Sequence, residues 1–551
     1  TCAAEKRRRR KRGLFPDPPK RVMINDLVCE GCGDCQVASN CVSVQPLETE
    51  FGRKRQIDQS NCNKDFSCIE GFCPSFVTVE GGRLKKAETT RSDASVALFA
   101  DLPLPPTRTL TGAYNVLVAG IGGTGVITIG ALLGMAAHLD GKACSTLDFT
   151  GLAQKNGAVT SHIRIANSPD ELTTVRITPG GADLILGCDM VVAAGPSVLS
   201  RAERSTTRMV VNSDLQPTAS FVINPDIDFE IGAMLDTLRH AASSNDLDVI
   251  DATGLATALM GDSIATNAFM LGFAFQKGRI PLSFDAIQRA IDLNGAAIDL
   301  NKTAFAWGRL AAHDLPRVLS AARFRTKRTI APVTVDETIR VRTKFLAAYQ
   351  DAAYAARYRA AVEQVRQAER NIVPNSQDLT EAFAQGLFKL MAYKDEYEVA
   401  RLYTDDAFAE KLTAQFEGDY RLTFHLAPPL FAKRDRQTGH LRKQSYGPWM
   451  RYLFKLLAPF KVLRGTPFDP FGYTAERKAE RALIEEYTAD LHRHAEAMTP
   501  QQLPTVLQLA RLAQTVRGFG HVKEHNLVRY RDERQRLKQI LAESHLTQAA
   551  E

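Results

Sequence analysis

Seven of the ten cysteines crowd into one short stretch, where their spacing could hold an iron–sulfur cluster. In CEGCGDC, two-residue spacers separate Cys29, Cys32 and Cys35, and further along the chain Cys73 is followed by Pro74. Such spacers let three consecutive thiolates each bind one iron of a [4Fe–4S] cluster, and a distant Cys-Pro supplies the fourth ligand in two-cluster ferredoxins. The pattern therefore predicts one cluster held by these four thiols.

The remaining cysteines of the stretch, Cys41, Cys62 and Cys68, do not repeat that spacing. The second run reads Cys62-x5-Cys68-x4-Cys73, where a bacterial ferredoxin repeats two-residue spacers, and seven thiols are one too few for two complete sets of four. A second cluster would need another ligand, such as the Asp65 carboxylate, a water or a distant thiol. A zinc site is the alternative for these thiols, so their role stays open.

A glycine-rich loop follows an apolar strand pattern in NVLVAGIGGTG, residues 115–125. Gly120, Gly122 and Gly125 have the GxGxxG spacing, which lets a turn tighten between strand and helix and lets the backbone approach a phosphate. Asp148 closes the next expected strand, where a ribose-binding carboxylate lies in a dinucleotide fold. Taken alone, the pattern indicates NAD or FAD binding; alternatively, the glycines only let the strand and the helix pack.

The loop lies in a region, residues 113–315, that alternates strand and helix patterns. Its short apolar segments are β-branched on both faces, which is typical of a mainly parallel sheet covered by helices. We therefore expect a doubly wound, Rossmann-like α/β domain. The expected strands are Asn115–Ala119, Ala143–Asp148, His162–Ala166, Met190–Ala194, Met209–Asn212 and Val249–Asp251.

Composition separates the rest of the chain into four further segments. Residues 1–20 are expected to be a basic linker, residues 21–84 a small ferredoxin-like iron–sulfur domain, and residues 85–112 a second linker. So small a cysteine domain buries little core unaided and depends on its cluster. From residue 333 to 551 helical periodicity dominates, which predicts a mainly α C-terminal domain.

Two helices of that C-terminal segment have readable boundaries. Asp378 followed by Glu381 is a capping-box pattern ahead of an apolar face, and it predicts a helix start at this point. A second long helix is expected from about Ala475 to Met498. No internal repeat is visible.

The net charge of +7 is local, because the run Lys6–Arg12 (KRRRRKR) is entirely cationic. A solvated linker is the favoured interpretation; a nucleic-acid or nuclear-targeting patch and a dock for an acidic partner are the alternatives. The uncharged stretch Val116–Ala137 is long enough to span a bilayer, but its glycines favour a strand, a loop and a helix. Clustered thiols favour a reducing compartment, so we expect a cytoplasmic protein with neither nucleic acid nor membrane as a partner.

Several longer stretches resemble one family of redox enzymes. GIGGTGVITIGALLG, DFTGLAQKNGAVTSHIRIA, NAFMLG and NKTAFAWGR resemble the gamma domain of 2-oxoacid:ferredoxin oxidoreductases. The lead-in TCAAEKRRRRKRG, the cysteine stretch, and LFKLMAYKDEYEVARLY, FEGDYRLTFHLAPPL, DPFGYTAER and RGFGHVKEHN resemble the C-terminal half of the fused indolepyruvate:ferredoxin oxidoreductases. The resemblance extends over nearly the whole chain.

The resemblance implies an activity. An arylpyruvate such as indolepyruvate or phenylpyruvate would be oxidatively decarboxylated on thiamine diphosphate, with the acyl group passing to coenzyme A and the electrons to ferredoxin. The family's thiamine domain contains Gly-Asp-Gly, a sequence that does not occur in these 551 residues. The thiamine diphosphate and its Mg²⁺ would therefore belong to an upstream part or a partner chain, and we expect an oligomeric enzyme of which this chain is one part.

The resemblance also bears on the glycine loop. It implies that an anionic group, with coenzyme A as the natural candidate, binds the loop residues Gly120, Gly122, Gly123, Thr124 and Gly125, unless these only shape the loop. The polar residues Gln154, Lys155, Asn156, Ser161 and His162 would lie where the gamma domain meets the active site, or would satisfy buried backbone groups. Two rival functions stay open: an NAD(P)-linked iron–sulfur oxidoreductase, and a nucleic-acid-binding protein that uses the basic run.

Overall fold

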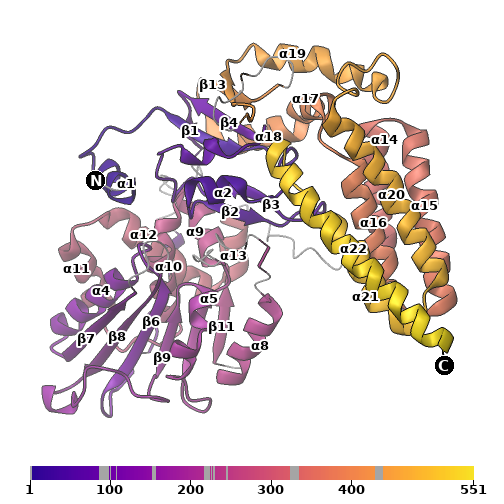
Figure 1. The fold of residues 1–551 in the computed structure, drawn as a ribbon. Helices are drawn as coiled ribbons and strands as arrows, with labels where there is room; N and C mark the ends of the chain where they lie inside the picture. Colours follow the sequence, from indigo (N-terminus) through magenta and orange to yellow (C-terminus); the bar gives the residue numbers. More distant parts are fainter. Residues whose placement is uncertain are drawn as a thin grey trace. The chain divides into compact units, whose positions relative to one another are not determined.

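The computed structural model describes residues 3–85, 98–99, 101–106, 108–151, 157–215, 224, 226–227, 230–242, 246–322, 334–428, 433 and 439–550. The chain divides into two compact units, whose elements are labelled in Figure 1. Unit 1 combines Thr1–Ile57, Asn63–Arg83 and Arg328–Glu551, and unit 2 combines Asp58–Cys62 with Leu84–Lys327.

Unit 2 is built around a six-stranded sheet with the strand order β11-β10-β9-β6-β8-β7. The strands are β6 (Tyr114–Ile121), β7 (Ala143–Thr150), β8 (Ala158–Ala166), β9 (Leu184–Gly187), β10 (Arg208–Asn212) and β11 (Leu247–Ile250). The helices include α4 (Val126–Leu139), α5 (Met190–Ala193), α6 (Pro196–Leu199), α8 (Ile231–Ala241), α9 (Ala252–Met260), α10 (Thr266–Gln276), α11 (Phe284–Asn294), α12 (Ile298–His313) and α13 (Leu315–Ala321).

The strands of this sheet do not all run in one direction. β6, β9, β10 and β11 are parallel, whereas β8 is antiparallel to both of its neighbours, β6 and β7. The expected mainly parallel, doubly wound sheet is therefore correct for four neighbouring strands and wrong at the β8–β7 edge. Only residues 151–157 separate β7 from β8, which is too short for the crossover that a parallel pair requires.

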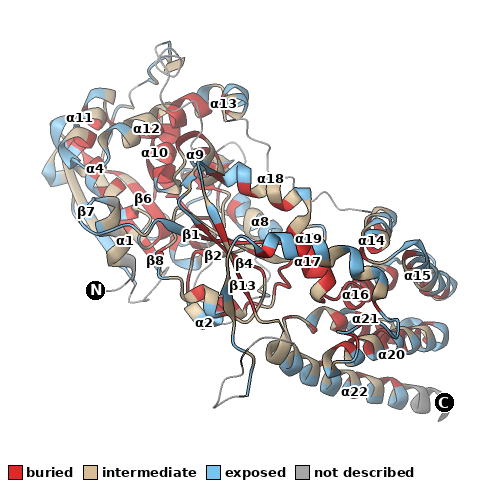
Figure 2. Ribbon diagram, turned by 90° about the horizontal axis from the view of Figure 1, so that it is seen from above, coloured by how far each residue is buried: buried red, intermediate tan, exposed pale blue. Residues whose placement is uncertain are grey.

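The two faces of the sheet contact different helices. Val116 and Val118 of β6 belong to a core that includes buried residues of α4 and of α9 to α12. Leu117 and Ala119, which alternate with them, belong to the opposite core with α5, α6 and α8. Figure 2 shows the buried residues along α10 and α12. Unit 2 is thus a three-layer α/β structure in which period-two alternation assigns each strand residue to one face.

Glycines allow α10 and α12 to approach each other closely. A Cβ atom on Gly308 would lie 1.9 Å from the carbonyl oxygen of Phe269, and one on Gly272 would lie 2.0 Å from the carbonyl oxygen of Phe305. Both distances are far inside van der Waals contact, so any larger residue would push the two helices apart. The NAFMLG and NKTAFAWGR stretches contain these two glycines.

One expected strand of unit 2 is wrong. Met190–Ala194 has the apolar, β-branched composition of a strand, yet Met190–Ala193 forms α5. The preceding Asp189 explains the difference, because its side chain accepts a hydrogen bond from the Val192 amide at 2.9 Å and so caps a helical turn. The strand lies just before it, as β9. The other five expected strands are confirmed, with ends that differ by a few residues.

Unit 1 contains a four-stranded antiparallel sheet with the order β1-β4-β13-β14. β1 (Lys20–Ile24) and β4 (Phe76–Glu80) flank the cysteine stretch, whereas β13 (Arg421–Leu426) and β14 (Gln444–Tyr446) belong to the C-terminal segment. The cysteine stretch also contains α2 (Asp34–Ser39), the hairpin β2 (Val44–Leu47) and β3 (Lys54–Ile57), and the short helix η1 (Ser67–Glu70).

The pairing of β4 with β13 joins segments that are far apart in the sequence. Val77 pairs with Phe424 and Val79 with Leu422 in the sheet register. The C-terminal segment was expected to be helical, and the alternating pattern of RLTFHL in β13 was not recognised as a strand. The predicted domain boundaries stay predictions. In the structure, the cysteine stretch and the C-terminal segment contribute strands to one sheet.

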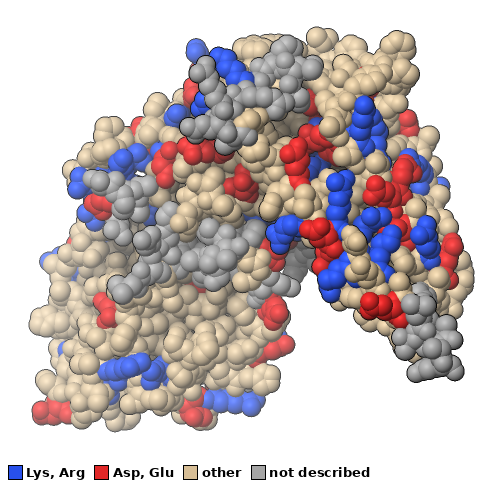
Figure 3. All heavy atoms as spheres, in the orientation of Figure 1, with Lys and Arg blue, Asp and Glu red and all other residues tan. Residues whose placement is uncertain are grey.

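The rest of unit 1 is helical, as expected. Its helices include α14 (Val335–Tyr349), α15 (Ala352–Ile372), α16 (Asp378–Met391), α17 (Glu396–Thr404), α18 (Asp406–Gln415), α19 (Met450–Leu457), α20 (Ala475–Ala497), α21 (Leu503–Arg511) and α22 (Gly520–Ala550). The helix predicted from about Ala475 to Met498 is confirmed as α20. Figure 3 shows basic and acidic side chains interspersed on the helices at the right of the view, where Arg534 and Lys538 of α22 pair with Asp490 of α20.

The N-terminus of α16 is capped from another helix rather than by the predicted capping box. Asp378 is the first residue of α16, and Gln377, which precedes it, makes no side-chain cap. The fully buried carboxylate of Glu369 on α15 instead accepts the amide hydrogens of Leu379 and Thr380 at 2.9 and 2.8 Å. A charged acceptor at a helix N-terminus is stabilising because it satisfies exposed amides and opposes the helix dipole.

The structure differs from the prediction for the basic run and agrees with the prediction for the uncharged stretch. The basic run expected in a linker is part of a helix, α1 (Ala3–Lys11), in which Glu5 and Arg9 form an ion pair. The stretch Val116–Ala137 forms β6, the glycine loop and most of α4, as predicted. Within the described ranges, no helix is both long enough and apolar enough to cross a bilayer.

Candidate functional site

Two glycines shape the loop that contains the first three cysteines. This loop follows β1 and ends at α2. Gly31 and Gly33 have φ angles of 70° and 80°, a left-handed conformation that favours glycine. A Cβ atom on Gly31 would also lie 2.2 Å from the carbonyl oxygen of Arg53. Glycine is therefore favoured at these two positions, because the chain turns sharply at both and at Gly31 passes close to the residue before β3.

The structure brings Cys29, Cys32, Cys35 and Cys73 close enough to influence one another electrostatically. Burial, followed by the neighbouring Cys73 and Cys29, raises the pKa of Cys32 to about 12. The pKa values of Cys29 and Cys35 are also raised, first by burial and then by Cys73. Cys29, Cys32 and Cys35, whose raised pKa values disfavour the charged form, need a strong positive charge before they can exist as thiolates together.

The surroundings of these four thiols fit an anionic iron–sulfur cluster. Cys29 Sγ accepts a hydrogen bond from the Gly31 amide at 3.4 Å, and Cys73 Sγ lies 3.0 Å from Ser75 Oγ. Hydrogen bonds to sulfur and a low-dielectric shell are the means by which proteins tune such clusters. Nowhere in the described part of the chain, which includes all seven cysteines of the stretch, do three His, Cys, Asp or Glu side chains converge on one point as a single metal ion requires.

Three cations lie near the same thiols. Lys54 and Arg55 of β3 interact electrostatically with Cys29, and Lys443 of the C-terminal segment interacts with Cys73 and Cys35. Burial lowers the pKa of Lys54 and of Lys443, while the cysteines act in the opposite direction. Positive charge around the thiols would stabilise a negatively charged group held by them.

Cys41, Cys62 and Cys68 are divided between the two units. Cys41, just after α2, and Cys68, in η1, are buried in the same small core as Cys29 and Cys35. Cys62 belongs to unit 2. Asp65, the carboxylate considered for a second cluster, accepts hydrogen bonds from the amide and the hydroxyl of Ser67 at 3.4 and 3.1 Å. Their role as ligands stays a prediction.

The C-terminal segment supplies residues around the cysteine stretch that sequence reasoning missed. Lys443 Nζ donates to the carbonyl oxygens of Ile69 and Gly71 at 2.6 Å each. The buried hydroxyl of Tyr403 donates to the carbonyl oxygen of Pro74 at 2.5 Å, directly after Cys73. Neither residue lies in a motif that signals such a role, because the contacts follow from the pairing of β13 with β4.

Ion pairs make further contacts between the two segments of unit 1. Lys411 binds both carboxylate oxygens of Asp26 at 2.5 Å, and the buried Glu30, next to Cys29, pairs with Lys389 of α16. The pKa of Lys389 is well below its usual range because the side chain is buried and near other cations. The loop that contains Cys29 is thus fixed on both sides by helices of the C-terminal segment.

The predicted glycine loop lies between β6 and α4, as the spacing indicated. Gly120 is required for packing, because a Cβ atom there would lie 2.9 Å from Val126 Cγ2. Gly123 and Gly125 have φ angles of 87° and 106°. The amides of Gly122 and Thr124 donate to carbonyl oxygens of the chain itself, those of Gly157 and Ile121, at 2.8 and 3.3 Å. These two amides therefore do not face an anion in this conformation.

Only part of the predicted polar segment after β7 lies within the described residues. Gln154, Lys155 and Asn156 lie outside the described residues. His162 of β8 is 4% exposed, and its Nδ1 accepts the Ile177 amide hydrogen at 3.2 Å. Burial and nearby arginines lower the pKa of His162 to about 4, so the ring is neutral near pH 7. The described contacts of His162 are those of a structural residue.

The dinucleotide alternative is not supported by the sheet topology. A Rossmann fold places the ribose-binding carboxylate on the strand next to the glycine-loop strand. Asp148 lies on β7, and β8 separates β7 from β6. The inserted antiparallel strand therefore moves the predicted carboxylate one strand further from the loop.

Comparisons with known proteins assign the two larger segments. The model described as pyruvate ferredoxin/flavodoxin oxidoreductase matches residues 115–311, and a family of unknown function (DUF6537) matches residues 335–536. The chain is 25% identical over 200 residues to the indolepyruvate oxidoreductase subunit IorB of Archaeoglobus fulgidus, an alignment that covers 35% of this chain and 92% of that relative.

A second relative and a solved structure match the same region. The chain is 28% identical over 172 residues to the common gamma subunit of the pyruvate/ketoisovalerate oxidoreductases of Pyrococcus furiosus, covering 31% of this chain and 81% of that subunit. A crystal structure of a pyruvate oxidoreductase subunit from Thermotoga maritima aligns with a TM-score of 0.27 at 21% identity, over 36% of this chain and 96% of that one.

The match to the family coincides with the six-stranded sheet and its helices rather than with the cysteine stretch. It agrees with the resemblance seen in GIGGTGVITIGALLG and the segments after it. Unit 2 therefore contains a gamma-type domain of the pyruvate ferredoxin/flavodoxin oxidoreductase family, and the chain is part of a 2-oxoacid:ferredoxin oxidoreductase.

Proposed function

We propose that this chain is the electron-transfer and gamma portion of a thiamine diphosphate-dependent oxidoreductase that acts on indolepyruvate or another arylpyruvate. The overall reaction converts the 2-oxoacid, coenzyme A and two oxidised ferredoxins into acyl-coenzyme A, carbon dioxide, two reduced ferredoxins and a proton. Two kinds of relatives support the reaction class, and those named as indolepyruvate oxidoreductase subunits favour an aromatic substrate.

The observation that carries the proposal is the electrostatic proximity of Cys73 to three thiols of an earlier loop. Cys29, Cys32 and Cys35 come from one loop and Cys73 from the segment before β4, and their mutual electrostatic effects indicate that they lie near one another. The donor set matches a [4Fe–4S] cluster, which would supply one-electron chemistry. Lys54, Arg55 and Lys443 would offset its negative charge.

The remaining cofactors involve other parts of the enzyme. Thiamine diphosphate with Mg²⁺, on an upstream part or a partner chain, supplies the carbanion chemistry of decarboxylation. The residues of this chain proposed to bind coenzyme A are Gly120, Gly122, Gly123, Thr124, Gly125, Gln154, Lys155 and Asn156. Only the amides of this loop that are not already bonded within the chain would contribute to phosphate binding, together with the positive end of α4.

A cysteine variant tests the cluster assignment. We expect Cys32→Ser to lower the iron and sulfide content and to remove the [4Fe–4S] signal in the electron paramagnetic resonance spectrum of the reduced protein, while unit 2 stays folded. Cys144→Ser is the matched control, since Cys144 lies on β7 of unit 2, and it should keep all iron. Full iron retention in Cys32→Ser would show that the assignment is wrong.

Turnover tests the reaction class. The chain, purified anaerobically with its thiamine-binding partner, should reduce methyl viologen with indolepyruvate only when both thiamine diphosphate and coenzyme A are present. Phenylpyruvate, pyruvate and 2-oxoglutarate measured side by side define the side chain accepted. If no 2-oxoacid reduces viologen in a preparation with intact clusters, the proposed reaction is refuted while the cluster assignment stands.

A further inference from the structure

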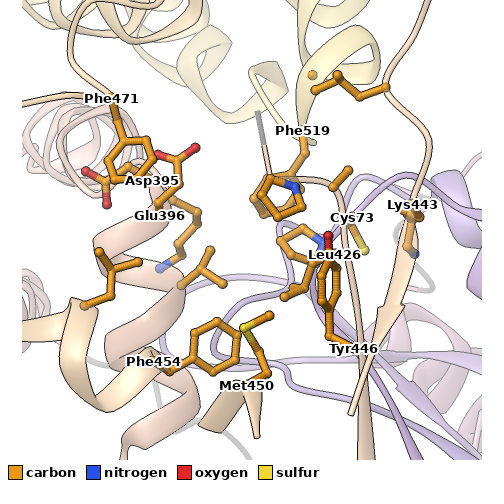
Figure 4. Close-up of a pocket in the computed structure, with 18 of the residues that line it drawn as sticks. Cys73, Asp395, Glu396, Leu426, Lys443, Tyr446, Met450, Phe454, Phe471 and Phe519 are labelled. Carbon is orange, nitrogen blue, oxygen red and sulfur yellow. The ribbon is translucent and has the colours of Figure 1, made fainter. Parts of the chain in front are cut away.

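An apolar cavity in unit 1 has no part in the proposed function. Its volume is about 400 Å³, and residues of β13, β14, α17 and α19 line it together with Phe72, Cys73 and Pro74. Aromatic and aliphatic side chains dominate its wall. Figure 4 shows Phe454 and Met450 below, with Phe471 on one side of the space and Phe519 near Cys73. A cavity of this size and lining is suited to a molecule with one or two aromatic rings.

One end of the cavity is polar and contains a cation with a weak partner. Lys394, whose side chain is 8% exposed, lies 3.8 Å from Glu398. Both carboxylate oxygens of Glu398 already accept hydrogen bonds from Arg401, at 2.8 Å each. Burial lowers the pKa of Lys394 to about 8 in spite of Glu398. Lys394 Nζ also lies 5.1 Å from the centroid of the Phe345 ring, a cation–π contact that brings no negative charge. An anion in the cavity would therefore compensate the ammonium group better than its present neighbours do.

The carboxyl group of Glu396, close to Lys394 in the sequence, can act as a hydrogen-bond donor. Glu396 also lines the cavity, and its buried Oε2 has no hydrogen-bond partner in the described part of the chain. Arg477 Nε lies 3.6 Å from Glu396 Oε2, yet burial outweighs this cation and raises the pKa of Glu396 to about 7. Near neutral pH a large fraction of Glu396 is protonated and able to donate a hydrogen bond.

The other charges at this end are paired. Asp395 accepts hydrogen bonds from Arg464 at 2.6 and 2.9 Å, and Arg477 also pairs with Glu480, which binds Lys523. The charged residues that act on Lys394 are Glu398, Lys54, Arg401 and Asp395, and those that act on Glu396 are Arg477, Asp395 and Glu476. Lys394 and Glu396 are therefore the groups at this end that a ligand would bind.

We propose that this cavity is a binding site for an aromatic monocarboxylate, with the ring among Phe454, Phe471 and Phe519 and the carboxylate between Lys394 and Glu396. An aromatic ring uses the apolar wall, and a single carboxylate accepts from the ammonium group and from the protonated carboxyl group. Binding would favour the charged form of Lys394 and the neutral form of Glu396, so it would take up protons. The cavity shares Cys73 in its wall with the proposed cluster, but the test of binding does not depend on turnover of the proposed reaction.

Calorimetry on the full-length chain tests this proposal with 2-naphthylacetate as the probe. We expect saturable binding of one molecule per chain, at least tenfold tighter than that of the uncharged isostere 2-naphthylacetamide. At pH 8, titrations in two buffers of different ionisation enthalpy should show an uptake of about half a proton or more, since Lys394 titrates near this pH. Affinity should fall more than tenfold from pH 6.5 to 9.

Matched variants separate this site from the rest of the molecule. Lys394→Met should abolish the preference for the carboxylate over the amide, whereas Lys455→Met, which changes an exposed lysine of α19, should leave it unchanged. Leu453→Trp should fill the cavity and weaken both probes at least tenfold, whereas Leu456→Trp, on the exposed side of α19, should not. The Leu453 pair keeps the test valid if Lys394→Met fails to fold.

The outcomes are separable from those of the turnover assay. Absence of saturable binding to the folded chain, or binding that neither Lys394→Met nor Leu453→Trp changes, would overturn the proposal. Equal affinity for the acid and the amide would overturn the assignment of the carboxylate end. A chain that binds the probe as expected but reduces no viologen with any 2-oxoacid would keep this site and refute the proposed function instead.

Discussion

Unit 2 takes all six strands of its sheet from one stretch of chain, residues 114–250, whereas unit 1 assembles its four-stranded sheet from two segments at opposite ends of the sequence. Thr78 Oγ1 and His425 Nε2 lie 2.7 Å apart in that sheet and are 347 residues apart in the chain. The core of unit 2 is therefore complete within its own segment. The cysteine stretch becomes a complete structure only with the C-terminal segment.

The difference shows what the C-terminal segment contributes to the structure of the cysteine stretch. In the cysteine stretch, Phe76 and Val77 are fully buried, and β13 provides the neighbouring strand that keeps the backbone groups of β4 from water. Ion pairs and side-chain hydrogen bonds from α16, α17 and α18 then hold the cysteine loop. The segment that matches a family of unknown function is thus a scaffold for the predicted cluster, in addition to any ligand it binds.

Of the changes we predict, removal of residues 334–551 should have the largest effect on stability. It tests directly whether the cysteine stretch depends on the C-terminal segment while unit 2 does not. Without β13 and β14, the stretch from β1 to β4 loses half of its sheet and much of its cover, so we expect it to be digested rapidly by trypsin. Unit 2 should resist, and Trp307, 1% exposed in α12, should keep its buried fluorescence emission. Equal protection of both regions would show that the cysteine stretch folds alone.

This contrast also explains how much of the fold the sequence could reveal. In unit 2, period-two and helical patterns lie in order along the chain, so five strands and the glycine loop were predictable. The strand direction of β8 and the helix at Met190 were not, because a short connection and one capping aspartate decided them. In unit 1, the strand β13 forms because β4 is its partner, and no local signal encodes that pairing.

In the candidate sites, too, local sequence patterns were predictable and long-range contacts were not. The spacing of Cys29, Cys32 and Cys35, with Cys73 added, predicted a group of thiols; in the structure these thiols are near enough to interact electrostatically, and their role as cluster ligands stays a prediction. Lys443 and Tyr403, which contact the same region, come from more than 300 residues away, and no sequence pattern indicates that they contact the cysteine stretch. Long-range contacts of this kind depend on tertiary packing, which single-sequence patterns do not contain.

A second prediction tests whether the stability of unit 2 depends on packing within that unit. Gly308→Ala places a Cβ atom against the Phe269 carbonyl oxygen, so α10 and α12 must separate, which should cost about 3 kcal/mol of unfolding free energy. Gly232→Ala is the matched control: this helical glycine of α8 has open space around it, and alanine should be neutral or stabilising by up to about 1 kcal/mol. Urea unfolding of Trp449→Phe protein, in which Trp307 reports unit 2, measures both.

A third prediction concerns the interior of unit 1. Glu369→Gln replaces one of the two carboxylate oxygens that accept the amides of Leu379 and Thr380 with an NH₂ donor. A buried amide left without an acceptor should cost about 2 kcal/mol. Glu363→Gln, an exposed change on the same helix, should cost less than about 0.5 kcal/mol. Unfolding followed at Trp449 in a Trp307→Phe background should change, whereas the urea midpoint of unit 2, read at Trp307 in a Trp449→Phe background, should not.

The smallest expected effect is a pH dependence that the two units share. His425 in β13 bonds Thr78 and Ser445, and burial with nearby Lys443 and Lys20 lowers its pKa to about 4, as burial does for His162 in unit 2. An unfolded histidine has a pKa near 6.5, so the unfolded state binds more protons between pH 6.5 and 4, and each unit loses stability as the pH falls through this range. Down to about pH 5.5 we expect a loss of about 1 kcal/mol for each histidine.

Replacement of either histidine assigns that loss to one unit. His425→Asn should weaken the acid-induced loss in unit 1, read at Trp449, and His162→Asn should do so in unit 2, read at Trp307. If either variant altered the acid response of both units equally, the units would unfold together and the comparison would fail. Independent responses would instead show that the contiguous α/β unit and the composite cysteine unit each keep their own stability.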